Sequence, residues 1–358
     1  MAEPARALRV VRIYLDGAHG QGKTTTGRAL AAASTAGEGV LFFPEPMAYW
    51  RTMFGTDALS GILAASARCA AASHGSARAR RAGAPRRRGR GGPGCVLPGQ
   101  VRGPVLNFAR ACPRCCAAWA GAGRRAGGPS CSTATPWRAC LCYPFARYCL
   151  REINAEDLLM LAAAMPPEAP GANLVVCTLP PAEQQRRLAA RARPGDRADA
   201  GFLVAVRNAY ALLVNTCAFL RAGAHGATAG TRWSGRTQMH WPRSQTPVVM
   251  NAKCAGAGLR DTLFAALKCR ELYPGGGTGL PAVHAWALDA LAGRLAALEV
   301  FVLDVSAAPD ACAAAVLDMR PAMQAACADG AAGATLATLA RQFALEMAGE
   351  ATAGPRGL

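Results

Sequence analysis

The chain has 358 residues, 52% of them hydrophobic, and a formal net charge of +18. This composition is typical of a globular protein with a substantial core and excludes an intrinsically disordered chain. Residues 1–10 lack the apolar core of a signal peptide, and no uninterrupted apolar run is long enough to cross a bilayer. We therefore expect a soluble intracellular protein whose 15 cysteines are reduced thiols.

Strands and helices alternate in the N-terminal part of the chain. Residues 10–15 form an apolar, β-branched run that predicts a buried strand, and residues 23–33 predict a helix. Residues 40–43 predict a second strand, and residues 47–63 predict a helix. Residues 65–138 show neither the period of a helix nor that of a strand.

Regular structure is expected again beyond this interruption. The predicted elements are helix 155–164, strand 173–179, helix 181–191, helix 200–220, helix 283–298, strand 300–305 and helix 336–347. Strands that alternate with helices predict an α/β fold with a central parallel sheet flanked by helices. We expect residues 1–358 to form a single domain of this kind.

The positive charge is confined to two stretches without acidic residues. Residues 64–138 contain fourteen arginines, and residues 223–253 contain three arginines and one lysine, which together equal the formal net charge of +18. We expect both segments to be poorly ordered. The charge also suggests a nucleic-acid-binding protein, but no aromatic residue interleaves the basic run Arg78–Arg90, which weakens this alternative.

Residues 17–24 fit the phosphate-binding loop pattern in full. They read Gly17-Ala18-His19-Gly20-Gln21-Gly22-Lys23-Thr24. The glycines allow backbone N–H groups to surround an oxyanion, and the helix that follows adds its positive dipole end. Lys23 is expected to reach the β- and γ-phosphates of ATP, and the Thr24 hydroxyl is expected to bind Mg²⁺. The strand before the loop and the helix after it predict a P-loop kinase fold.

Glu45 lies between two prolines directly after the strand predicted for residues 40–43. Ligands bind at the carboxyl edge of open α/β sheets, so a rigidly held carboxylate there suits a general base that accepts a proton from an attacking hydroxyl. From spacing alone, a solvated glutamate in a turn is an equally good interpretation.

A basic cluster ends the helix predicted for residues 181–191. It continues into a turn and contains Arg186, Arg187, Arg191 and Arg193. Arginines that close over a triphosphate stabilise the charge that develops during transfer. A charged helix face is more commonly a solvated surface, but the nearby phosphate loop favours the functional interpretation.

The run Cys142–Tyr148 combines aromatic rings with a cation. Tyr143 is suited to stacking on a planar base, and Arg147 is suited to binding a carboxylate or phosphate. The alternative is that these aromatic residues simply fill the core.

Taken together, these segments resemble the thymidine kinases of herpesviruses. The matching segments occur in the family's order at residues 13–17, 44–51, 142–148, 166–168, 171–173, 191–197, 261–264, 284–289 and 343–347. They cover most of the chain outside the two acid-free stretches. The resemblance implies transfer of a phosphate from ATP to the 5′-hydroxyl of thymidine, with Mg²⁺, by a homodimer.

The resemblance also implies roles for individual residues. Glu45 matches the general base, and Asp196 stands where the family has a glutamate that holds the deoxyribose. The other implied roles are thymine contacts for Trp50 and Tyr143, an ATP contact for Arg187, and phosphate or substrate contacts for Arg191 and Arg193.

Three features of the family are absent. Leu63 replaces a tyrosine, a glutamine that pairs with thymine has no counterpart, and Thr133–Pro136 replaces an Asp-Arg-His-Pro motif that supplies a magnesium-site aspartate and a catalytic arginine. Ser130–Arg138 can be encoded by a set of codons that gives Val-Phe-Asp-Arg-His-Pro-Val when it is read two bases later. We therefore hypothesise that both acid-free stretches are out-of-frame translation of a GC-rich gene.

Two further kinase alternatives stay open. A kinase for another deoxynucleoside or for a nucleoside monophosphate would share most of these motifs. A catalytically impaired ATP-binding relative would keep the phosphate loop and lack the missing side chains.

Overall fold

The computed structural model describes residues 8–33, 40–43, 60, 64, 130–132, 135–150, 152–165, 168, 171–191, 199–222, 247–250, 259–268, 282–328, 338, 341–342 and 345. A five-stranded parallel sheet runs through its centre in the order β3-β4-β2-β5-β6. Its strands are β2 (Arg12–Asp16), β3 (Leu41–Phe43), β4 (Ser130–Ser132), β5 (Ala172–Thr178) and β6 (Glu299–Asp304). The short strands β1 (Leu8–Val10) and β7 (Ala326–Ala328) form a separate antiparallel pair.

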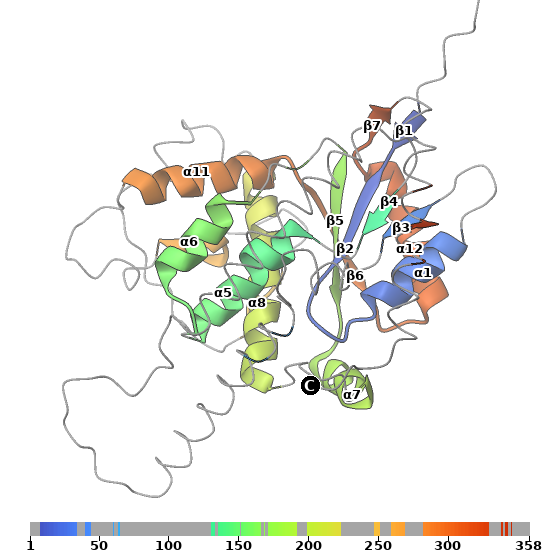
Figure 1. The fold of residues 1–358 in the computed structure, drawn as a ribbon, viewed down its shortest axis with the longest axis horizontal. Coiled ribbons are helices and arrows are strands. Elements are labelled where there is room, and N and C mark those ends of the chain that lie inside the picture. The colour runs from blue at the N-terminus through green and yellow to red at the C-terminus, as the bar shows by residue number, and fades with distance from the viewer. Residues whose placement is uncertain are drawn as a thin grey trace, which may run out of the picture.

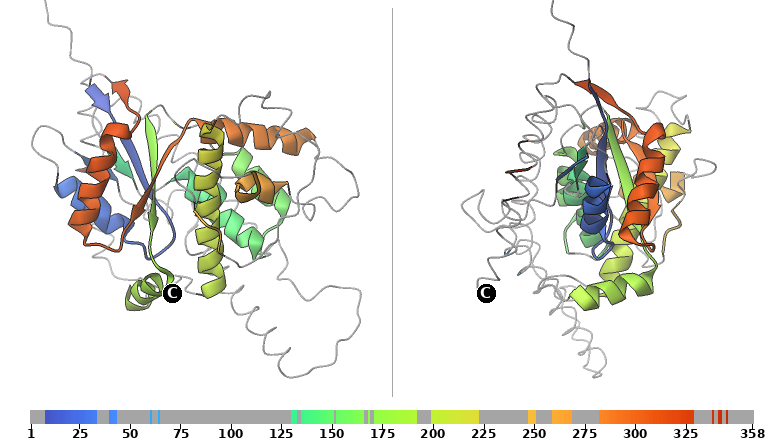
Figure 2. Two further views of the ribbon diagram at one scale, coloured as in Figure 1. Left: turned by 180° about the vertical axis from the view of Figure 1, so that it is seen from behind. Right: turned by 90° about the vertical axis from the view of Figure 1, so that its right-hand side faces the viewer.

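Helices cover both faces of the sheet, as Figure 1 and the reverse view in Figure 2 show. On one face α1 (Lys23–Ala32) packs against α12 (Pro309–Met319). The other face carries a larger group, which consists of α5 (Tyr143–Cys149), α6 (Ala155–Ala163), α8 (Ala200–Arg221), α10 (Leu263–Leu267) and α11 (Ala282–Ala296). The helix α7 (Pro181–Arg191) follows β5 and lies beyond the end of the sheet. This arrangement confirms the predicted central parallel sheet flanked by helices.

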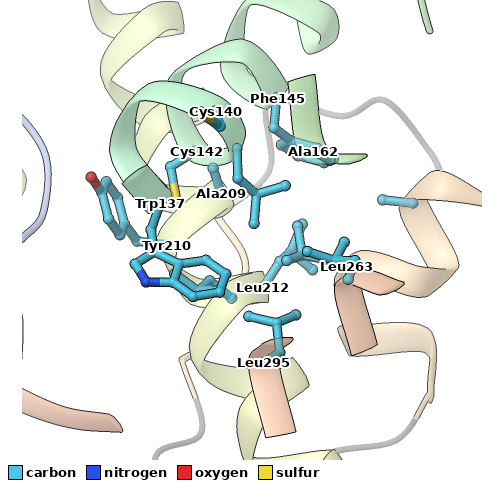
Figure 3. Packing of buried hydrophobic residues seen from close by; sticks show 14 of the residues in the cluster. Trp137, Cys140, Cys142, Phe145, Ala162, Ala209, Tyr210, Leu212, Leu263 and Leu295 are labelled. Carbon is cyan, nitrogen blue, oxygen red and sulfur yellow. The ribbon is translucent and has the colours of Figure 1, made fainter. Parts of the chain in front are cut away.

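Two hydrophobic clusters hold these layers together. The smaller cluster joins the sheet to α1 and α12, and the larger one lies between the sheet and the helices of the other face. Figure 3 shows part of the larger cluster, including Trp137, Cys140, Cys142, Phe145, Ala209, Tyr210, Leu212, Leu263 and Leu295. Strand β5 is buried along nearly its whole length, as expected for the inner strand of a parallel sheet.

Helix α8 is the central helix of the larger cluster. It is long and apolar enough to cross a membrane by length and composition, but 83% of its most apolar window is buried inside the protein. The Asp199 side chain caps its N-terminus by accepting a hydrogen bond of 2.8 Å from the Phe202 N–H. Its apolar character therefore reflects packing between the sheet and the other helices.

The predicted irregular segment ends earlier than expected, so that prediction is wrong at its C-terminal end. Ser130–Ser132 forms strand β4 between β2 and β3, and a π-helix over Arg138–Cys142 leads into α5. Strand β4 has three residues and no β-branched side chain, which is why periodicity did not reveal it. Its central residue Cys131 pairs with Ile13 on one side and Phe42 on the other, so its neighbours make it a strand.

The other predicted elements agree with the structure to within one or two residues where it describes them. Sequence reasoning missed α12, whose alanines give little amphipathic contrast, and the short helix α10. Apart from Ser60, which is helical, the helix predicted for residues 47–63 lies outside the described residues, as does most of the stretch 223–253. The cysteines in the described part of the chain are free thiols, and most of them are buried.

A partly buried carboxyl group lies in the segment just before β5. The Tyr14 hydroxyl on β2 donates a hydrogen bond of 3.1 Å to Glu168 Oε2. Burial raises the pKa of Glu168 to about 7, and the hydrogen bond from Tyr14 acts in the opposite direction. At neutral pH the folded protein therefore holds a carboxyl group whose charged form is penalised.

Replacing Glu168 with glutamine is expected to stabilise the protein above pH 7. Because the pKa of Glu168 is raised on folding, the folded state binds this proton more tightly, and the free energy of unfolding falls as pH rises from about 4.5 to about 7. Glu168→Gln removes this decrease in stability. We therefore expect the free energy of unfolding, measured with urea, to rise by about 1–2 kcal/mol at pH 8 and hardly at all at pH 4. A variant no more stable than the original at pH 8 would contradict this account.

Candidate active site

The phosphate-binding loop connects the end of β2 to the start of α1. Gly17 and Gly20 adopt φ values of +140° and +76°, which L side chains rarely adopt. A Cβ atom at Gly17 would overlap the Gln21 side chain, and one at Gly20 would lie 2.8 Å from Leu188 Cγ on α7. These two glycines therefore permit both the tight turn and the close approach of α7.

Lys23 brings its ammonium group to the centre of this loop. Its Nζ donates to the carbonyl oxygens of Gly17 at 2.9 Å and Ala18 at 2.7 Å, and the residue is buried. Thr24 follows it on the first turn of α1 and is half-buried. The predicted ATP loop therefore curves around the Lys23 ammonium group and ends in the first turn of α1.

Asp16 ties the start of the loop to two other elements. Its Oδ1 accepts from the Gly17 N–H at 2.8 Å and from the Tyr210 hydroxyl of α8 at 2.7 Å, and its Oδ2 accepts from the Thr135 hydroxyl. Burial raises the pKa of Asp16, and the positive charge of Lys23 opposes this shift. Sequence reasoning did not single out Asp16 or Tyr210, although an aspartate that ends an apolar strand is a usable signal.

Helix α7 lies directly against the loop. The buried Gln184 donates from Nε2 to the His19 carbonyl oxygen at 2.7 Å. Arg187 also reaches the loop, since a Cβ atom at Gly22 would lie 3.4 Å from its Nη1. The structure therefore places the predicted ATP-binding Arg187 beside the loop. Gln184 is a contact that the sequence did not reveal.

The guanidinium of Arg187 is held in place by neighbouring groups. Its Nε donates to Glu183 Oε1 at 2.7 Å and its Nη2 donates to the Val305 carbonyl oxygen at 3.2 Å. Arg186 binds the same carboxylate, and the hydrogen bonds from these arginines lower the pKa of Glu183 to about 2. Arg191 is the last residue of α7. The predicted basic cluster is thus partly an ordered ion-pair network next to the loop.

An aromatic platform adjoins the loop on the side of α5 and α8. The Tyr143 ring contacts the His19 ring edge-on, with centroids 4.8 Å apart and planes inclined by 73°. Phe202 lies 6.1 Å from Tyr143 and 6.2 Å from His19, centroid to centroid. The Arg138 Cζ lies 5.0 Å from the centre of the Tyr143 ring, a cation–π distance.

A π-helical turn produces the pairing of Arg138 with Tyr143. The Tyr143 N–H donates to the Arg138 carbonyl oxygen, five residues earlier, so the two side chains lie one turn apart. Pro144 follows, and a proline in a regular helix would clash with the carbonyl four residues before it. The π-helical turn therefore lies directly before the proline, where a break in the regular hydrogen-bond pattern is expected.

The other predicted site residues are either engaged in an ion pair of their own or lie outside the described part. Arg147 is buried and forms an ion pair with Glu152, with Nη1 2.8 Å from Oε2. Its predicted role in substrate binding therefore stays a prediction. The predictions for Glu45, Trp50, Arg193 and Asp196 fall outside the described residues. Within the described ranges, the structure contains no cluster of three or more His, Cys, Asp or Glu residues that suits a metal ion.

Comparison with known proteins places this site in a family. The family model for thymidine kinase from herpesvirus matches residues 17–82 and 131–305. The chain is 93% identical to the thymidine kinase of bovine herpesvirus 1 (strain 6660), with both chains covered in full. The chain belongs to the herpesvirus thymidine kinase family.

More distant members of the family agree with this assignment. The thymidine kinase of suid herpesvirus 1 is 37% identical over 88% of this chain and 93% of its own length. The crystal structure of the equine herpesvirus 4 thymidine kinase complexed with thymidine and ADP matches with a TM-score of 0.76 and 32% identity, covering 96% of this chain and 99% of that chain. The predicted P-loop kinase fold and the predicted family are confirmed.

The comparisons also bear on the acid-free stretches. The family model leaves residues 83–130 unmatched, which lie inside the stretch 64–138, whereas the stretch 223–253 falls in the matched range. At 93% identity over 364 aligned positions, the two chains differ at fewer positions than the stretch 64–138 contains. The strain 6660 enzyme therefore shares most of that stretch. The longer stretch is therefore not peculiar to this thymidine kinase sequence.

Replacing Lys23 with alanine is expected to weaken ATP binding by roughly 10- to 100-fold, the cost of losing a charge-assisted contact to phosphate. Arg28→Ala provides the matched control, since Arg28 is an exposed cation on the same helix. Isothermal titration with ATP should show the loss for Lys23→Ala and little change for Arg28→Ala. Equal affinities in the two variants would remove Lys23 from the ATP site.

Proposed function

We propose that this thymidine kinase transfers the γ-phosphate of ATP to the 5′-hydroxyl of thymidine, within the site formed by the phosphate loop and the aromatic platform. The proposal is supported chiefly by the contact between the two, in which His19 of the loop touches Tyr143 at 4.8 Å between ring centroids. Family membership gives the substrate pair, because a relative has been solved with thymidine and ADP.

The ATP side of the site is the loop with its two cations. In the structure the Lys23 ammonium is satisfied by the carbonyl oxygens of Gly17 and Ala18, and we infer that ATP phosphates replace them. Arg187 adjoins Gly22 and is restrained by Glu183, so it adds positive charge with little loss of side-chain entropy. Arg191 and Arg193 are proposed to close over the phosphates as the substrate binds.

Mg²⁺ is proposed to lie between the loop and the ATP phosphates. The Thr24 hydroxyl at the start of α1 suits this role, whereas both oxygens of Asp16 are already engaged by hydrogen-bond donors. Mg²⁺ commonly keeps several water ligands and binds through one or two protein groups plus substrate phosphates. When bound, the ion supplies charge neutralisation for the phosphoryl group.

The nucleoside side of the site is proposed to lie on the aromatic platform. Tyr143, together with Trp50, would stack on the thymine ring, which is worth roughly 1–3 kcal/mol per base–aromatic contact. Glu45 is proposed as the general base for the 5′-hydroxyl and Asp196 as the deoxyribose contact. Arg147 would bind substrate only by sharing its charge with Glu152.

These residues act mainly by placing two substrates and balancing charge. Phosphoryl transfer passes through a loose transition state in which the protein makes little covalent contribution. The loop fixes the donor phosphate, the platform fixes the acceptor nucleoside, and α7 carries cations toward the bond that breaks. A soluble protein inside the cell, where ATP is abundant, is the setting we propose.

A panel of nucleosides with radiolabelled ATP tests this function. Thymidine is expected to be the best acceptor, with label recovered as the 5′-monophosphate. Faster labelling of another deoxynucleoside, or of thymidine monophosphate, would favour the alternative substrates. Binding of ATP without any labelling would indicate a catalytically impaired relative.

Glu45→Gln is expected to lower kcat by roughly 10²- to 10⁴-fold, the usual contribution of a general base, while ATP affinity stays unchanged. The amide keeps the size of the side chain but cannot accept the proton. Steady-state kinetics with thymidine, paired with ATP titration, separates these effects. Turnover at the original rate would leave Glu45 as a solvated turn residue.

A homodimer is proposed through the face formed by α6 and α11, which lie side by side in Figure 1. Two large apolar residues are exposed there, Met160 at 56% and Trp286 at 62%. Exposed apolar groups on adjacent helices are a common mark of protein interfaces.

Trp286→Lys is expected to shift the protein toward monomer, because it replaces an exposed apolar side chain of this face with a charge. Light scattering coupled to size-exclusion chromatography measures the mass directly. Val249→Lys serves as the control, since Val249 is 82% exposed outside these helices. A dimer that resists Trp286→Lys would place the interface elsewhere.

A further inference from the structure

His19 belongs to the phosphate loop through its backbone and to the aromatic platform through its ring. Its carbonyl oxygen accepts the 2.7 Å hydrogen bond from Gln184, and a Cβ atom at the adjacent Gly20 would lie 2.8 Å from Leu188 Cγ of the same helix. The backbone of His19 is therefore fixed between the loop and α7.

The ring of His19 completes a closed group of three aromatic rings. It lies edge-on to Tyr143 at 4.8 Å and nearly parallel to Phe202, with planes inclined by 26° and centroids 6.2 Å apart. Tyr143 and Phe202 in turn contact each other at 6.1 Å. The three rings come from the loop, α5 and α8, so moving one displaces the other two.

The electrostatic surroundings keep this ring uncharged. Burial lowers the pKa of His19 well below its usual range, and the positive charges of Arg138, Lys23, Arg191 and Arg147 act in the same direction. A neutral imidazole packs on aromatic rings without adding another cation to this basic site. Its contribution is therefore one of shape and contact.

We propose that His19 is a positioning residue that couples the two substrate sites: when the loop binds a nucleotide, His19 orders Tyr143 and Phe202 and thereby tightens nucleoside binding. This inference rests on the proposed function, in which Tyr143 carries the base. Because coupling between sites is reciprocal, bound nucleoside tightens nucleotide binding by the same factor. The coupling passes through ring contacts and needs no proton transfer.

The test measures the dissociation constant of thymidine by titration calorimetry with and without saturating ADP. In the original protein, ADP is expected to tighten thymidine binding by roughly 3- to 10-fold, the effect of one aromatic contact. The coupling ratio is the dissociation constant of thymidine without ADP divided by that with ADP. In His19→Ala this ratio is expected to fall to about 1. His19→Phe keeps a ring at this position and is expected to restore most of the ratio, which a merely structural defect would not allow.

Two further variants make the result specific. His284→Ala makes the same chemical change on α11, away from the loop, and is expected to keep the original ratio. Phe202→Leu removes the stacking partner of His19, so the ratio of the two thymidine dissociation constants is expected to fall to about 1. This variant provides the test if His19→Ala does not fold.

The outcomes separate this proposal from the function on which it rests. A protein that binds ADP and thymidine independently, or a His19→Ala variant that keeps the ratio, overturns the role of His19 and leaves the kinase assignment intact. Failure of His19→Phe to restore the ratio also overturns it. A protein that binds ADP but not thymidine overturns the proposed function as well.

Discussion

The active site depends on the buried carboxylate of Asp16. A charged group without solvent is costly, and the structure offsets this cost with donors from Gly17, Thr135 and Tyr210 and with the nearby charge of Lys23. Each donor comes from a different element. One side chain therefore fixes where the loop begins, where α8 packs against the sheet, and where the helix that leads to Tyr143 starts.

The sequence was sufficient for the parts of the site that are local. The loop residues Gly17–Thr24 follow from their pattern, because a backbone that surrounds phosphate needs glycines at fixed spacing. The parallel sheet follows from the alternation of strands and helices, and Arg187, for which an ATP contact is predicted, lies beside the loop. These features depend on residues that are close together in the chain or on a motif with a known mechanism.

The parts that sequence reasoning missed depend on distant contacts. Strand β4 has little strand propensity of its own and exists through pairing with β2 and β3. The bond between Gln184 and His19 joins residues 165 positions apart, and that between Tyr210 and Asp16 joins residues 194 apart. No periodicity within one segment reports such contacts. Pro144 signals a break in the helix, but neither the π-helical turn nor its pairing of Arg138 with Tyr143 follows from the sequence.

The end of the longer acid-free stretch shows which of its side chains the fold needs. Thr135 donates to Asp16 and accepts from the Arg138 N–H at 3.0 Å, so one hydroxyl both anchors the loop and begins the helix. A hydroxyl suffices for these tasks, which explains how the fold continues where the family has a histidine.

The neighbouring Trp137 is a stricter test of the frame hypothesis. The alternative reading of the codons places valine there, whereas Trp137 is fully buried and is among the largest side chains in its cluster. Valine would remove most of that volume, and a core at native packing density does not absorb such a loss without moving its neighbours. Tyr210 is a member of the same cluster and also bonds Asp16. The identity of residue 137 is therefore coupled, through core packing, to the position of the phosphate loop.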